Sequence, residues 1–184
     1  MKVKILIVVL VLLATFVVLL LNQKNRTNLP IQNTTSTVTI NDECEGDIMN
    51  ATLSKVDTIN RNTNKYASST KELLGLTTEG GVQIDYTDKN LRVLVAQHFY
   101  GETYHSIVNY YYDNSSPILI NTQRLEYNAP ITVEPFPVIK STTTNMYFLD
   151  PKGKLCMWQQ NNEIKSTDIK SQDFVNSLLK EILQ

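Results

Sequence analysis

The spacing of hydrophobic and polar positions changes several times along the chain, and its first feature is an almost unbroken apolar run. The run occupies residues 5–21, and Thr15 is its only polar member. Its length of roughly 17 residues is at the short end of what a membrane-spanning helix needs. Lys2 and Lys4 precede it, as basic residues precede the apolar core of a secretory signal. We therefore expect residues 1–21 to be an export signal or a transmembrane anchor.

The residues that follow the run bear on whether it is cleaved. Nothing from Val17 to Arg26 resembles the pair of small residues at which signal peptides are cut. Basic residues flank both ends of the run, so the orientation depends mainly on the short N-terminal tail and the long C-terminal part. We expect a retained anchor that is embedded in the membrane, with the C-terminal domain outside the cytoplasm. A cleaved signal, which would give a secreted protein, is the alternative.

Helical spacing begins only after a polar segment. Residues 22–43 are rich in Asn, Thr, Gln and Ser, as in a flexible tether, and residues 44–184 suffice for a single domain. We expect a helix from Asp47, and a second short helix over residues 68–74 that ends near Gly75. The buried face of the first helix is expected to comprise Ile48, Leu53, Val56 and Ile59.

A period of two, typical of β-strands, replaces the helical spacing after Gly81. Turn residues at 88–90, 100–103, 113–117 and 150–153 separate the alternating segments and predict an antiparallel meander. In the first hairpin we expect Tyr86 opposite Leu91, Ile84 opposite Val93, and Val82 opposite Val95.

The chain ends in a segment with amphipathic helical spacing, in which Phe174, Leu178 and Leu179 form one face and Leu183 lies near the end. The predicted fold class is therefore α+β. It comprises an N-terminal membrane helix, a helical region, an antiparallel β-meander of about six strands and a C-terminal helix.

Short turn and strand motifs occur through residues 75–160. They are Thr78-Glu79-Gly80-Gly81, Tyr100-Gly101-Glu102-Thr103, Tyr110-Tyr111-Tyr112-Asp113-Asn114, Arg124-x-x-Tyr127-Asn128-x-Pro130 and Tyr147-Phe148-x-Asp150. This set resembles a functionally uncharacterised group of small exported bacterial proteins that have an export signal and a tyrosine-rich strand meander. The resemblance implies the same fold and location for this chain, and it transfers no catalytic residue.

The charge of the chain bears on whether its partner could be a nucleic acid. The 18 acidic residues slightly outnumber the 17 basic ones, two of which precede the apolar run. Nucleic-acid binding needs a basic patch, so we expect no nucleic-acid partner.

Cys44 and Cys156 both follow the apolar run, and in an oxidising compartment they could form a disulfide. Two separate buried thiols are the alternative.

Strand alternation predicts which residues share a face of the sheet. Val95, Gln97 and Phe99 are expected to lie on one face with Tyr104, Val108, Tyr110 and Tyr112. The opposite face is a candidate binding patch if no helix covers it. This patch comprises Tyr111, His98, His105, Ile107 and Leu94.

His98 and His105 are expected to lie on adjacent strands, as direct neighbours if the loop between the strands holds two residues rather than four. There they could share a metal ion with Glu102. Zinc needs three or four ligands, however, and no further ligand stands at a recognised spacing, so we expect no metal site. The sequence contains no nucleophile elbow, so we expect no catalytic nucleophile. It contains no phosphate-binding glycine loop, and we expect no cofactor.

The favoured function is a non-enzymatic, membrane-anchored binding domain that contacts a protein or a cell-envelope component. One alternative is a hydrolase of envelope polymers that uses scattered carboxylates such as Glu79, Asp85 and Glu102. The other is a structural accessory subunit of a membrane assembly, in which the anchor itself makes contacts.

Overall fold

The computed structural model describes residues 46–182, with side-chain surroundings from Ile48 onward. The expected anchor at 1–21, the tether at 22–43, Cys44 and Leu183 lie outside these residues. None of the helices within residues 46–182 has the length and apolar character needed to cross a membrane.

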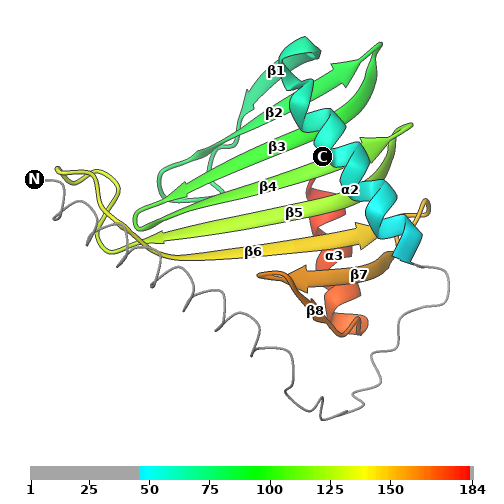
Figure 1. The fold of residues 1–184 in the computed structure, drawn as a ribbon. Coiled ribbons are helices and arrows are strands. Elements are labelled where there is room, and N and C mark those ends of the chain that lie inside the picture. The colour runs from blue at the N-terminus through cyan, green and yellow to red at the C-terminus, as the bar shows by residue number, and fades with distance from the viewer. Residues whose placement is uncertain (1–45, 183–184) are drawn as a thin grey trace, which may run out of the picture. The chain divides into compact units, whose positions relative to one another are not determined.

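One antiparallel sheet of eight strands forms the centre of the domain, so the α+β prediction is confirmed but the count of about six strands was too low. Every strand pairs with its neighbour in sequence, so the sheet is a simple meander (Figure 1). The strands are β1 (Ala67–Glu72), β2 (Gly81–Asp88), β3 (Leu91–Gly101), β4 (Tyr104–Asp113), β5 (Ser116–Tyr127), β6 (Ile139–Leu149), β7 (Leu155–Gln160) and β8 (Glu163–Lys165).

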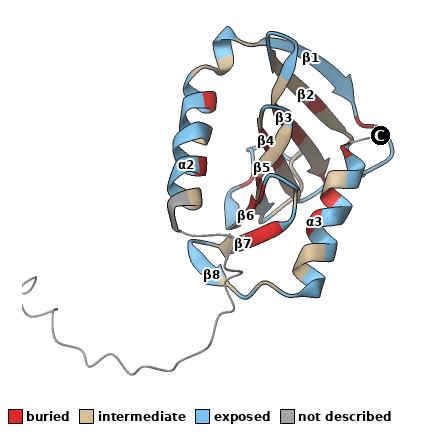
Figure 2. Ribbon diagram, turned by 90° about the vertical axis from the view of Figure 1, so that its right-hand side faces the viewer, coloured by how far each residue is buried: buried red, intermediate tan, exposed pale blue. Residues whose placement is uncertain are grey.

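Two helices cover opposite faces of this sheet, which gives three layers (Figure 2). Helix α2 (Gly46–Arg61) continues into the short 3-10 helix η1 (Thr63–Lys65), and helix α3 (Ile169–Glu181) ends the described chain. A capping box begins α3: the side chain of Asp168 accepts a hydrogen bond from the Ser171 amide, and the Ser171 hydroxyl accepts one from the Asp168 amide.

The helix expected over residues 68–74 is instead the edge strand β1, so this prediction was wrong. All six of its residues are exposed, and it is held through backbone pairing with β2. A strand that buries no side chain needs no alternation of polar and apolar residues, so its sequence gives no period-two signal. Gly75 follows it at a φ of 75°, within the segment that connects β1 to β2.

The register expected for the first hairpin was also wrong. Lys89 and Asn90 alone form the turn, both at positive φ, and Tyr86 pairs with Leu94. A bulge inserts Val93 as an extra residue in β3. Because one extra residue reverses which face every later side chain occupies, Val82, Ile84 and Tyr86 share a face with Leu94 and Ala96.

The face beneath α3 holds the larger core. Val95, Tyr110 and Ile120 are fully buried there against Val175 and Leu178 of the helix. The predicted grouping of Val95, Gln97 and Phe99 with Tyr104, Val108, Tyr110 and Tyr112 is confirmed by the pairing of β3 with β4. Phe174, which was expected in the buried face of α3, remains half-exposed and contacts the ring of Tyr147.

The face beneath α2 holds a second core. Ile59 of the helix is buried there against Leu94, Tyr111, Leu119 and Phe148. The buried face of α2 is rotated from the predicted one, because Met49 and Val56 pack on this cluster whereas Leu53 is 37 % exposed.

Candidate functional site

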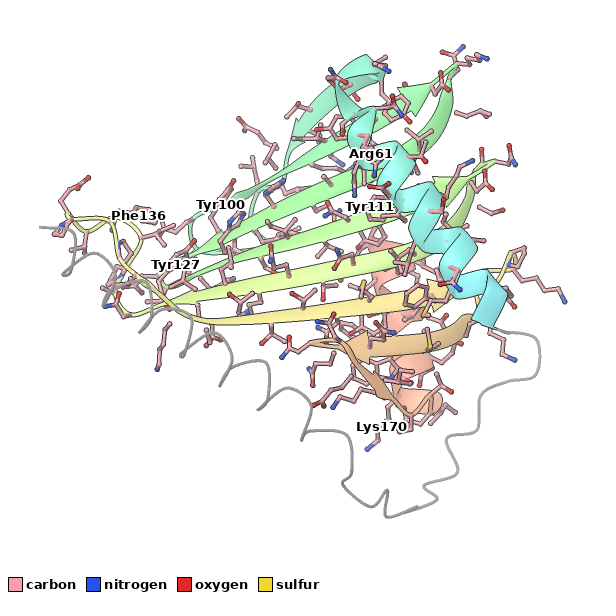
Figure 3. All side chains as sticks on the ribbon, in the orientation of Figure 1. Arg61, Tyr100, Tyr111, Tyr127, Phe136 and Lys170 are labelled. Carbon is pink, nitrogen blue, oxygen red and sulfur yellow. The ribbon has the colours of Figure 1, made fainter. Side chains whose placement is uncertain are left out.

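The five residues of the predicted patch lie on one face of the sheet, but α2 divides them. Tyr111 is only 3 % exposed, and its hydroxyl donates a hydrogen bond to Asn60 Oδ1 of the helix at 3.2 Å. Leu94 is buried beside it. Figure 3 shows Tyr111 where α2 crosses the sheet and Tyr100 nearer the other end of the strands. Tyr111 and Leu94 therefore belong to the core and are not available to a partner.

His98, His105 and Ile107 remain half-buried beyond the helix, on the part of this face that carries Tyr100. The two histidines are not directly opposite, because His98 pairs with Ile107 and His105 pairs with Tyr100. They are diagonal neighbours, and His98 Nδ1 lies 3.2 Å from His105 Nε2. The ring of Tyr100 stacks on His105 with 4.6 Å between centroids. One imidazole therefore donates a hydrogen bond to the other, and Tyr100 covers the pair.

Burial lowers the pKa of both imidazoles, and the charge of His98 lowers the pKa of His105 further. Two neutral imidazoles can form an N–H···N hydrogen bond with no metal ion between them. In the part of the chain that the structure describes, no three His, Cys, Asp or Glu side chains are grouped as metal ligands. Glu102, the third ligand considered with the histidines, is exposed in the turn between β3 and β4.

Cys156 is buried at the start of β7 and is not a free thiol. Its expected partner, Cys44, lies outside the described residues, so their pairing stays a prediction.

The three carboxylates of the hydrolase alternative are dispersed. Asp85 lies on the sheet face that α3 covers. Its carboxylate is 2.9 Å from Arg92 Nη2 and accepts a hydrogen bond from Gln83. Glu79 and Glu102 are exposed in loops at the other end of β2 and β3. None of the three lines the cavity on the α3 face of the sheet.

A cavity of about 590 Å³ opens on the α3 face of the sheet. It lies between the sheet, the C-terminal end of α3 and the segment that joins β1 to β2. This volume is within the range of roughly 300–1,000 Å³ that is usual for small-molecule sites. Its apolar lining comes from Leu73, Leu74, Leu76, Phe99, Tyr104 and Ile182, and its uncharged polar lining from Thr77, Gln83, Gln97 and Ser106.

The charged groups at the cavity come from opposite sides. Lys71 pairs with Gln83 and Arg124 pairs with Ser106, so strand alternation places both cations on the face that forms the cavity floor. Glu72 also lines the cavity, but it pairs with Val82, so its side chain belongs to the opposite face. Glu181 contributes an acid from the end of α3. The floor of the cavity is therefore basic, and its acid is at the helix.

Arg124 contacts both a neighbouring ring and a carboxylate. Its guanidinium lies over the ring of Tyr104 at 4.0 Å from the centroid, and its Nε lies 3.2 Å from Glu126 Oε1. The Glu126 carboxylate also accepts a hydrogen bond from Ser141. These contacts involve one face of the guanidinium and its Nε.

A chain of hydrogen bonds supports the polar part of the floor. Gln97, which is 3 % exposed, donates to Gln83 Oε1 at 2.9 Å, and Gln83 donates to Asp85 Oδ2 at 2.7 Å. The hydroxyl of Tyr110 lies 3.4 Å from Gln97 Oε1 and 3.3 Å from the carbonyl oxygen of Leu178 on α3. Burial raises the pKa of Tyr110, so its hydroxyl stays protonated and acts as a donor.

Exposed apolar side chains gather at the end of the sheet where the cavity opens. Leu74 is 79 % exposed and Leu76 is 64 % exposed, although both line the cavity. Backbone hydrogen bonds from Glu79 to Tyr100 and from Ile131 to Glu102 join three loops at this end. The loop between β5 and β6 adds further exposed apolar residues, namely Val133, Phe136 and Val138. Figure 3 shows Phe136 of this loop at the same end of the strands as Tyr100.

Sequence reasoning did not find the cavity. Strand alternation correctly placed Gln97, Phe99 and Tyr104 on one face, but the end of α3 and the segment after β1 approach that face only in the folded chain. An available signal was Gln97, a polar residue between Val95 and Phe99 on an otherwise apolar face of its strand.

Comparison with known proteins gives no family assignment. No protein-family model, curated protein or solved structure matches this chain.

Proposed function

We propose that this chain is a non-enzymatic, membrane-tethered binding protein whose extracytoplasmic domain takes a small component of the cell envelope into the cavity on the α3 face. The observation that carries this proposal is the cavity itself, which combines an apolar wall with polar groups held in place by their own hydrogen bonds. Such a combination binds one part of a ligand by burial and orients another part by hydrogen bonding.

A binding role accounts for the cavity better than hydrolysis does. A hydrolase of envelope polymers needs two carboxyl groups within a few ångströms of the scissile bond. Of the two glutamates at this cavity, Glu72 directs its side chain to the opposite face of the sheet. Glu181 is then the single carboxylate among the described lining residues, which is one fewer than this hydrolysis needs.

The tether follows from the sequence. Residues 1–21 carry the apolar run and residues 22–43 the polar linker. N-terminal sequencing of the mature protein tests the anchor: we expect an intact Met1, and a start near Lys24 would show a cleaved signal instead.

Analysis of co-purified molecules tests the binding role. The full-length protein should be isolated from its native membrane, and the small molecules that denaturation releases should be identified by mass spectrometry. We expect a near-stoichiometric compound from the wild type that is lost in Ser106→Trp, because an indole at this position occupies space on the cavity floor that the ligand needs. Ser68→Trp is the matched control on the exposed opposite face of β1. Equal compounds in all three proteins, or none in any of them, would contradict the proposal.

A further inference from the structure

We infer that the ligand of this cavity is an anionic amphiphile whose acid group binds Arg124 and whose apolar part lies against Leu74, Leu76 and Phe99. This inference rests on the proposed binding function and adds the chemical class of the ligand. The acid group is a carboxylate or a phosphate, since an arginine fork is complementary to both.

The charge of the head group follows from the cavity floor. Arg124 and Lys71 both project from the sheet face that forms this floor, on β5 and β1. Glu126 balances part of the charge of Arg124, but it does so through Nε. An acid group in the cavity can bind this guanidinium, which lines the cavity, lies over the ring of Tyr104 and contacts Glu126 through Nε.

The acid at the other side of the cavity sets the direction of the ligand. Glu181 lies at the end of α3, and it would repel an anionic group placed beside the helix. The head group is therefore favoured at the Arg124 side. An uncharged part of the ligand then occupies the space toward the helix and the loop that follows β1.

The apolar part of the ligand follows from the exposed leucines. Leu74 and Leu76 leave most of their surface in water, although both border the cavity. Burial of apolar surface stabilises a complex, so a ligand that covers these two side chains gains affinity from them. The cluster of exposed apolar loop residues at the same end of the sheet makes the mouth suited to an amphiphile that arrives from a membrane.

Photolabelling with matched probes tests this inference on the full-length protein in its membrane. The three probes are a dodecanoic acid with a diazirine on its chain, the corresponding alkyl phosphate and the corresponding alcohol. Labelled positions are located by peptide mass spectrometry. We expect the acid or the phosphate to label the peptides around Leu74, Leu76 and Phe99 at least tenfold more than the alcohol, and a difference between the two anions identifies the head group.

Variants of Arg124 separate charge recognition from binding. In Arg124→Gln we expect labelling by the anionic probe to fall to the level of the alcohol, and in Arg124→Lys to fall partway. Lys152→Gln, which removes an exposed charge in the turn after β6, is the control and should change nothing.

Different results would contradict the anionic class of the ligand and the binding function itself. Equal labelling of the cavity by the anionic probes and the alcohol, unaffected by Arg124→Gln, would overturn the anionic class and leave the binding function in place. Absence of labelling at the cavity with every probe would overturn the amphiphile, whereas the binding function is judged by the co-purified compound and its loss in Ser106→Trp.

Discussion

His98 Nδ1 and His105 Nε2 lie 3.2 Å apart although the two residues do not pair across β3 and β4. Each imidazole is half-buried, and the stacked ring of Tyr100 covers the pair. A second proton on this pair would place two positive charges in contact in a partly desolvated site. The pair is therefore most stable when at most one of the two rings is charged.

This relationship predicts a loss of stability in mild acid. Because the pKa of both imidazoles is lowered in the folded protein, the unfolded chain binds more protons as the pH falls below the ordinary histidine value of about 6.5. The stability that the neutral histidine pair contributes is fully present above that pH. It is lost as the pH falls toward the lowered pKa values of the folded protein. Urea unfolding of the wild type and of the His98→Gln/His105→Gln double variant between pH 5.5 and 8 measures it. We expect a shallower pH dependence in the double variant, and an unchanged slope would contradict the assignment.

The contact of Tyr111 with α2 predicts a graded effect of substitution. Tyr111→Phe removes the hydrogen bond to Asn60 and should lower the free energy of unfolding by about 0.5–1.5 kcal/mol. Tyr111→Ala also opens a hole in the buried cluster and should cost about 3–5 kcal/mol. Leu91→Ala, at an exposed position, is the control and should change the value by less than about 0.5 kcal/mol. Equal small effects of both Tyr111 variants would show that the helix does not pack as described.

The hydrogen bond between Gln97 and Gln83 predicts coupled substitutions. Gln97→Leu leaves Gln83 Oε1 without its donor and should destabilise the fold by about 1–3 kcal/mol. The double variant Gln83→Leu/Gln97→Leu should cost less than the sum of the two single variants, because it removes both partners together. Chemical denaturation of the four proteins gives the coupling energy, and additive losses would argue against the bond.

The packing of Tyr104 predicts that Gly101 controls the ligand site. A Cβ at Gly101 would overlap the ring of Tyr104, so Gly101→Ala must displace that ring. The guanidinium of Arg124 lies over the same ring and would lose its position. We expect labelling by the anionic probe to fall several-fold, while the neighbouring exposed variant Thr103→Ala retains it. Retained labelling in Gly101→Ala would show that Tyr104 does not position Arg124.

The cysteine pair predicts a cross-linked peptide. Digestion without reduction should yield one species that contains both Cys44 and Cys156, and reduction should separate them. In the chain-entropy model, closing so long a loop stabilises a fold by about 4–5 kcal/mol, so reduction should also lower the urea midpoint. Two separate peptides before reduction would rule the pairing out.

The sequence predicted the parts of the fold that depend on local spacing. The turns within residues 88–90 and 100–103, the meander order and the terminal helix all follow from alternation, turn residues and helical period. The strand β1 could not be found in this way, because it buries no side chain. The bulge at Val93 was equally hidden, since a single extra residue leaves the alternation on either side of it intact.

The candidate site was predicted less well, because it depends on which helix covers which face. Alternation correctly placed His98, His105 and Tyr111 on the same face of the sheet. Nothing in their spacing shows that α2 covers Tyr111 and leaves the histidines beyond it. The cavity likewise depends on the approach of the end of α3, which lies far along the chain from the strands that form its floor. Such long-range packing leaves no periodic pattern in a sequence.

The strict sequential order of the eight strands has a consequence for the path by which the domain folds. Each strand pairs with its neighbour in sequence, so the sheet can grow one hairpin at a time and each step closes only a short loop. Two-state proteins with mostly local contacts fold faster than those that depend on distant pairings. The contacts that span the chain are those of the helices, such as Tyr111 with Asn60 and Tyr110 with Leu178. We therefore expect docking of α2 and α3 to follow sheet formation, so that the cavity is completed last.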